Sequence, residues 1–155
     1  MTMTMKLPLA LLMVSALLAA GATTAAPHDH HPAYSAGEPG NPKKPSREIT
    51  VEMSEMDYSP RAIEVKRGEQ IKFVVRNVGT EDHEFILAST EDNLKHAAAM
   101  RKHPGMAHEE PSGLRLARRQ SGEIVWKFTR AGTFEYSCLI ADHREYGMTG
   151  KVVVK

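Results

Sequence analysis

The sequence predicts an all-β domain, a β-sandwich with one short helical insertion. Short apolar runs recur from about residue 47 to the C-terminus, and turn residues separate them. Several of these runs alternate apolar and polar residues, which is the period of a half-buried strand. One segment in the middle of the chain has helical character instead. About seven short strands with turns between them are typical of a β-sandwich.

The N-terminus has the pattern of a secretory signal peptide, which we expect over residues 1–25. Lys6 precedes an apolar run at 7–20, and small residues follow that run. We expect cleavage between Ala22 and Ala26, and therefore a periplasmic protein. A membrane anchor is disfavoured because the apolar run is shorter than the ~20 residues that span a bilayer.

Residues 26–46 are expected to form a disordered leader that is rich in histidine and proline. Five prolines, two glycines and three histidines occur between residues 27 and 46, with almost no apolar periodicity. The folded domain is expected over residues 47–155, a length that suits one domain. Loss of Lys6 with the signal peptide leaves equal numbers of basic and acidic residues. Nucleic acid is therefore not an expected partner.

Three apolar runs predict the first strands, at residues 49–53, 63–65 and 71–75. Apolar and polar residues alternate in the first and third runs, and a turn at 66–69 precedes the third. A fourth strand is expected from His83, where a polar turn passes into an apolar run. A helix is expected next, because the segment after this strand begins with acidic residues and contains three consecutive alanines.

Three further strands are expected at residues 124–128, 133–138 and 150–154. In the second of these, Cys138 shares a face with two aromatic residues, whereas Glu135 lies on the opposite face. The cysteine is therefore expected to point inward. A thiolate in an apolar interior is costly unless a cation neutralises it, and a metal ion would do so.

The only cysteine of the chain begins a run with metal-ligand spacing. Cys138, His143 and Met148 follow one another as C-x4-H-x4-M. Thiolate and thioether favour Cu(I), imidazole also suits Cu(II), and two histidines, a cysteine and a weak axial methionine form the type 1 copper arrangement. One copper ion per domain is therefore the expected cofactor. Zinc would accept the cysteine and the histidines, but a thioether is a poor ligand for it.

The second histidine ligand is expected to be His83, because it lies at the start of a strand. Other histidines lie in the leader or in the polar middle segment, at His28, His30, His31, His96, His103 and His108. A ligand at a strand end is held by a rigid frame, which these segments do not offer.

Four segments together resemble the cupredoxin family over residues 47–155. They are Asn77-x-Gly79-x3-His83, Gly132-Thr133-Phe134-x-Tyr136-x-Cys138, His143-x3-Gly147-Met148 and the valine-rich last strand. The resemblance implies a Greek-key β-sandwich whose type 1 copper is bound by His83, Cys138 and His143, with Met148 axial. The cysteine-to-histidine spacing is longer than in plastocyanin. With the helical insertion, it looks more like the small periplasmic cupredoxins associated with bacterial copper tolerance.

Further histidines and methionines lie outside this motif. Candidates for additional, weakly bound copper are His28, His30, His31, Met100, His103, Met106 and His108. The alternative is that the histidines and methionines between residues 89 and 122 are ordinary surface residues of a segment that covers the sandwich, with Met100 packing against it.

The expected function is to bind or redox-handle copper in periplasmic copper tolerance. The extra candidate ligands favour this function over its alternative, a soluble periplasmic one-electron carrier between redox partners. An enzyme is not expected, because copper oxidases and reductases resemble tandem cupredoxin domains with His-x-His pairs, whereas Ser137 and Leu139 flank Cys138 here. The expected partners are copper ions and a periplasmic redox or copper-transfer protein.

Overall fold

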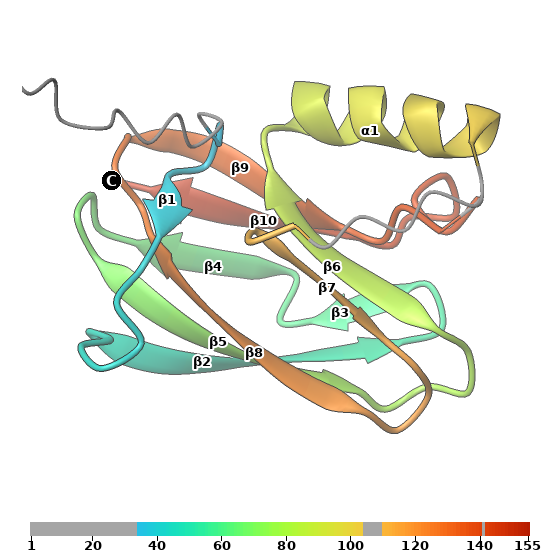
Figure 1. Cartoon of the computed structure of the whole chain (residues 1–155), viewed down its shortest axis with the longest axis horizontal. Helices are drawn as coiled ribbons and strands as arrows, with labels where there is room; N and C mark the ends of the chain where they lie inside the picture. Colours follow the sequence, from blue (N-terminus) through green and yellow to red (C-terminus); the bar gives the residue numbers. More distant parts are fainter. Residues whose placement is uncertain (1–33, 104–109, 141) are drawn as a thin grey trace, which may run out of the picture. The chain divides into compact units, whose positions relative to one another are not determined.

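The computed structural model describes residues 34–103, 110–140 and 142–155. In these parts the chain forms two five-stranded sheets and one helix (Figure 1). The elements are β1 Glu38–Pro39, β2 Arg47–Ser54, β3 Asp57–Ser59, β4 Ala62–Val65, β5 Gln70–Asn77, β6 His83–Ala88, α1 Thr90–Lys102, β7 Gly113–Leu116, β8 Ser121–Lys127, β9 Gly132–Ser137 and β10 Thr149–Val154. The predicted β-sandwich with one helical insertion is confirmed.

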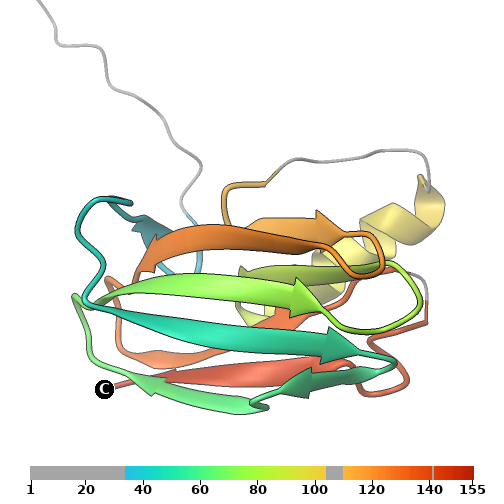
Figure 2. The ribbon, with the colours of Figure 1, turned by 90° about the horizontal axis from the view of Figure 1, so that it is seen from below.

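The two sheets have the strand orders β1-β8-β5-β2-β3 and β4-β10-β9-β6-β7. Two pairings are parallel, β2 with β5 and β4 with β10, so the chain crosses between the sheets as a Greek-key sandwich requires. Figure 2 shows β8, β5 and β2 running side by side in the first sheet. Aromatic side chains fill the space between the sheets, where Phe73, Phe85, Trp126, Phe128 and Tyr136 are fully buried.

The pairing of β6 with β9 brings distant parts of the sequence to one end of the sandwich. These strands are antiparallel, with Ile86 opposite Ser137. The first residue of β6, His83, therefore lies at the end where β9 finishes and Cys138 follows. The chain then turns back into β10, whose Thr149 pairs with Ser137. Two strand ends and one loop thus meet at this end of the sandwich.

Helix α1 covers the outer face of β6 and β9 (Figure 1). It begins after Ser89, whose side chain accepts a hydrogen bond from the Asp92 amide at 3.1 Å, as a helix N-cap does. Asn93 and Ala97 are the helix residues buried against the sheet. Because α1 covers this face, Glu135 and Ser137 are buried even though they point away from the core between the sheets.

Part of the expected leader is ordered. Within residues 34–46, strand β1 pairs with β8, and Ala36 is fully buried. The indole Nε1–H of Trp126 donates to the Ala36 carbonyl at 3.1 Å, and the Gly40 amide donates to the Val125 carbonyl at 2.8 Å. Backbone hydrogen bonds hold this segment, and such bonds leave no apolar periodicity in the sequence. The domain therefore begins before residue 47.

The remaining N-terminal predictions lie outside the described residues. These are the signal peptide at 1–25 and the leader from 26 to 33. Within the described ranges, no helix is both long and apolar enough to cross a membrane.

Candidate metal centre

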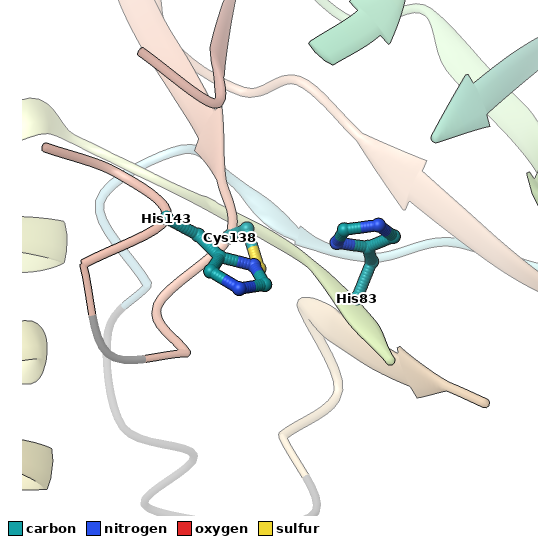
Figure 3. Close-up of side chains that lie close together, drawn as sticks. All are labelled: His83, Cys138 and His143. Carbon is teal, nitrogen blue, oxygen red and sulfur yellow. The ribbon is translucent and has the colours of Figure 1, made fainter. Parts of the chain in front are cut away.

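Three buried side chains converge at the end of the sandwich where β6 begins and β9 finishes. They are His83, Cys138 and His143, and one potential ligand atom from each lies within 4.8 Å of the others. The first two residues are fully buried, and His143 is 8% exposed. Figure 3 shows the Cys138 thiol beside the His143 ring, with the His83 ring approaching from β6. The structure thus brings together three of the four ligands predicted from the sequence.

Backbone hydrogen bonds shape the loop that joins β9 to β10. The Cys138 amide donates to the Met148 carbonyl at 3.2 Å, and the Met148 amide donates to the His143 carbonyl at 3.0 Å. The His143 amide in turn donates to the Ile140 carbonyl at 3.1 Å. The loop also turns at Asp142, whose φ of 70° is in the left-handed region. These bonds place the histidine close to the cysteine that precedes it.

Asn77 holds the loop that leads into His83. Its side chain is buried and donates to the carbonyls of Glu81 and Leu116 at 2.7 and 3.0 Å. Its Oδ1 atom accepts a hydrogen bond from the Gly79 amide at 3.0 Å. A single buried amide therefore joins both ends of this turn to the neighbouring strand, which explains the role of the Asn77 motif noted in the sequence.

The cysteine sulfur lies in an environment that keeps it protonated until a cation binds. Burial raises the pKa of Cys138 to about 11, although the Glu84 amide donates a hydrogen bond to Sγ at 3.3 Å. Only the thiolate binds metals, so a cation at this position must displace the thiol proton. The Glu84 amide would then stabilise the thiolate. Sequence reasoning did not identify this donor, because a backbone amide leaves no residue-type signal.

The His83 ring fits a metal ligand better than a structural histidine. Among the described residues, neither Nδ1 nor Nε2 of this fully buried ring has a hydrogen-bond partner. A buried polar atom without a partner costs roughly 1–3 kcal/mol. Burial lowers the pKa of His83, as does the charge of nearby His143, and these effects favour the neutral imidazole that binds metals. A metal ion would provide the partner that the ring lacks.

The two nitrogens of His143 face different surroundings. Nδ1 lies 3.3 Å from Sγ of Cys138, whereas Nε2 lies 3.5 Å from a carboxylate oxygen of Glu81. The ring centroids of His143 and His83 are 5.3 Å apart. One nitrogen of His143 therefore faces the sulfur and is placed to bind the same cation. The other nitrogen faces an exposed carboxylate at the surface.

Met148 lies directly before β10 and is fully buried. Its backbone bonds to Cys138 and His143 place it at the same end of the sandwich. Its role as a fourth, axial ligand remains a prediction.

The accessory copper ligands stay a prediction. Met100 is half-buried in α1, and His103 is an exposed residue at the end of the helix. In the part of the chain that the structure describes, no second group of three histidine, cysteine or acidic side chains converges on one point. The other candidates lie outside the described residues, at His28, His30, His31, Met106 and His108.

Comparison with known proteins agrees with this site. The model of copper-binding proteins of the plastocyanin/azurin family matches residues 45–155. The chain belongs to this family. The cupredoxin resemblance of the sequence motifs is thereby confirmed, and the site described above lies inside the matched region.

Two curated relatives and one solved structure are similar to this cupredoxin. The copper-resistant cuproprotein CopI of Rubrivivax gelatinosus is 45% identical over 94% of this chain and 95% of its own length. CopI of Pseudomonas aeruginosa is 30% identical over 96% of each chain. The structure of a reduced auracyanin from Roseiflexus castenholzii has a TM-score of 0.62 at 18% identity, covering 72% of this chain and 99% of that one. At this identity the likeness shows the fold alone.

Proposed function

We propose that this chain is a periplasmic type 1 copper protein that binds one copper ion at the candidate metal centre and acts in copper tolerance. One observation carries the copper site: His83, Cys138 and His143 converge in a buried position, and the His83 ring has no hydrogen-bond partner among the described residues. Soft and borderline ligands in this combination suit copper.

In this proposal His83, Cys138 and His143 would hold the copper ion, and Met148 would be a weaker fourth ligand. The strand ends and the backbone hydrogen bonds of the loop hold the ligands in place, so the site would need little rearrangement if the bound copper changed charge. When bound, copper would supply one-electron redox chemistry. The protein excludes water, holds the geometry and stabilises the thiolate through the Glu84 amide.

The proposed role in copper tolerance is supported by the relatives. Two proteins named copper-resistant cuproprotein match nearly the whole chain, including the region outside the sandwich. The histidines of the leader and the methionines and histidines of the middle segment add candidate ligands for further copper. Copper handling outside the cytoplasm also agrees with the signal peptide predicted from the sequence.

A one-electron carrier is the second candidate, and one observation favours it. His143 is slightly exposed whereas Cys138 is fully buried, so an electron would enter or leave through this histidine. A carrier also needs an apolar docking surface there. Leu139 is buried, Ile140 is only partly exposed, and Tyr146 is the large apolar residue of the loop that is well exposed, at 70%. The Glu81 carboxylate lies beside the His143 ring, so this surface is not predominantly apolar. Copper tolerance is therefore the preferred function.

Deletion of the gene in its native host separates the two functions. The proposal predicts that the deletion strain grows poorly in copper, and that the wild-type gene restores growth whereas a Cys138→Ser gene does not. Unchanged copper tolerance together with a loss of respiratory electron transfer would support the carrier and reject the proposal.

A further inference from the structure

Glu135 is an acidic residue in an unusually buried position. It lies in β9, three residues before Cys138 and on the opposite face of the strand, beneath α1. Only 9% of the residue is exposed. A buried carboxylate is costly unless a cation and hydrogen-bond donors compensate for it. The side chains that contact Glu135 therefore have to compensate for the cost of burying its carboxylate.

The cation that pairs with Glu135 comes from the loop that carries His143. Both oxygens accept hydrogen bonds from the Arg144 guanidinium: Nη2 donates to Oε2 at 2.9 Å and to Oε1 at 3.0 Å, and Nε donates to Oε1 at 3.1 Å. Arg144 is itself mostly buried, with 18% of its side chain exposed. Such a two-pronged contact fixes the orientation of both groups, unlike a single contact between flexible side chains.

Helix α1 completes the surroundings of the carboxylate. The Thr90 hydroxyl donates to Oε2 at 3.3 Å, and the Asn93 side chain donates to Oε1 at 3.4 Å. The Ser137 hydroxyl also donates to Oε1. The carboxylate thus contacts three parts of the chain: strand β9, helix α1 and the loop of residues 138–148, which we call the ligand loop. We refer to the contact between Glu135 and Arg144 as the loop latch.

Backbone hydrogen bonds restrain the loop, but no rigid residue adds to them. No proline occurs between Cys138 and Met148. Proline would restrict the backbone, whereas loops without it lose more conformational freedom when they become ordered. Arg144 directly follows His143, so the latch acts on the residue next to the histidine ligand.

We propose that Arg144 is a positioning residue, which uses the loop latch to hold His143 beside Cys138 and thereby slows copper release. The inference rests on the copper site proposed above, because it assigns a function to the support of that site. It also explains the helical insertion, which covers Glu135 and turns a surface ion pair into a buried one. An exposed pair would contribute little, because solvent screens it.

Three variants test whether Arg144 positions His143 or only neutralises the charge of Glu135. Arg144→Met breaks the latch and leaves the Glu135 carboxylate unpaired. The double variant Glu135→Gln/Arg144→Met breaks the latch and leaves no buried charge. Arg101→Met is the matched control, because Arg101 also forms an ion pair with the ligand loop, to Glu145 at 2.7 Å, but both partners are about half exposed.

Copper release from the loaded protein to a strong chelator is the first measurement. Loss of a residue that supports a metal ligand typically lowers metal affinity 10- to 100-fold, so we expect the double variant to release copper about 10- to 100-fold faster than wild type. Its free energy of unfolding should stay close to the wild-type value, because no charge is left without a partner. The Arg101 control should release copper at the wild-type rate.

Amide hydrogen exchange of the copper-free protein is the second measurement. The His143 and Met148 amides should exchange faster in the double variant than in wild type, because the loop that protects them is no longer held. A double variant with wild-type copper release and wild-type exchange would overturn the proposal and leave Arg144 as a counter-charge only. If copper gave no thiolate absorption in the wild-type protein, the copper site itself would fail, whereas the exchange result would still test the latch.

Discussion

Sγ of Cys138 and Nδ1 of His143 lie 3.3 Å apart, across a loop in which four residues separate them. The third member of the cluster, His83, comes from a different strand and reaches the same position through the pairing of β6 with β9. The geometry of the cluster therefore depends on the sandwich as well as on the local motif. This arrangement leads to predictions about stability, metal binding and stoichiometry.

Replacing His83 should separate stability from copper binding. His83→Leu removes two buried nitrogens without partners among the described residues, so the copper-free variant should be as stable as wild type or more stable by about 1 kcal/mol. Copper binding should be lost. Denaturant unfolding of the copper-free protein and a copper titration would measure these two effects.

Phe85→Leu is the matched control for that prediction. It introduces the same residue, leucine, at a fully buried position of the same strand and should cost about 1 kcal/mol or more, because it leaves a cavity. If the His83 variant were destabilised as much as this control, the ring would have a structural role that the proposal does not include.

Asn77 should matter to both stability and copper affinity. Its buried side chain makes three hydrogen bonds around the turn before His83, so Asn77→Ala should destabilise the protein by roughly 1–3 kcal/mol. Copper affinity should also fall, because the turn carries a ligand. Asn41→Ala, at an exposed position, should change stability by less than about 0.5 kcal/mol. Equal effects of the two substitutions in urea unfolding would contradict this role.

The sequence predicted the parts of this molecule that depend on local pattern. The alternation in the strand of Cys138 indicated an inward-facing sulfur, and the residue is fully buried. The acidic residues after the strand of His83 predicted a helix start, and α1 begins there, with Ser89 as its N-cap. The cluster of His83, Cys138 and His143 was predicted from spacing and context, because strand ends and short loops place ligands reproducibly.

The parts that were not predicted depend on contacts between distant segments. Strand β1 is held by backbone pairing with β8, which requires no particular side chains. Glu135 was assigned to the face opposite Cys138, but its burial depends on α1, which covers that face. Its pairing with Arg144 is likewise set by the fold of the loop. Contacts between distant segments of this kind cannot be predicted from the periodicity of apolar residues in the sequence.

Copper stoichiometry tests the accessory ligands of the middle segment. The double variant Met106→Ala/His108→Ala should bind fewer copper ions than wild type in a titration followed by metal analysis, because it removes two candidate ligands. The absorption of the central site should not change. An unchanged number of bound ions would show instead that these are surface residues with no role in metal binding.

The most direct test of the central claim is the optical and EPR spectrum of the copper-loaded protein and of its Cys138→Ser variant. The account predicts an intense thiolate-to-copper absorption in the wild-type protein, with the EPR spectrum of a type 1 site. Both features should be absent from the variant, because a hydroxyl cannot replace the thiolate ligand. A variant that kept the absorption, or a wild-type protein that showed none with Cu(II) bound, would contradict the assignment of His83, Cys138 and His143 as a copper site.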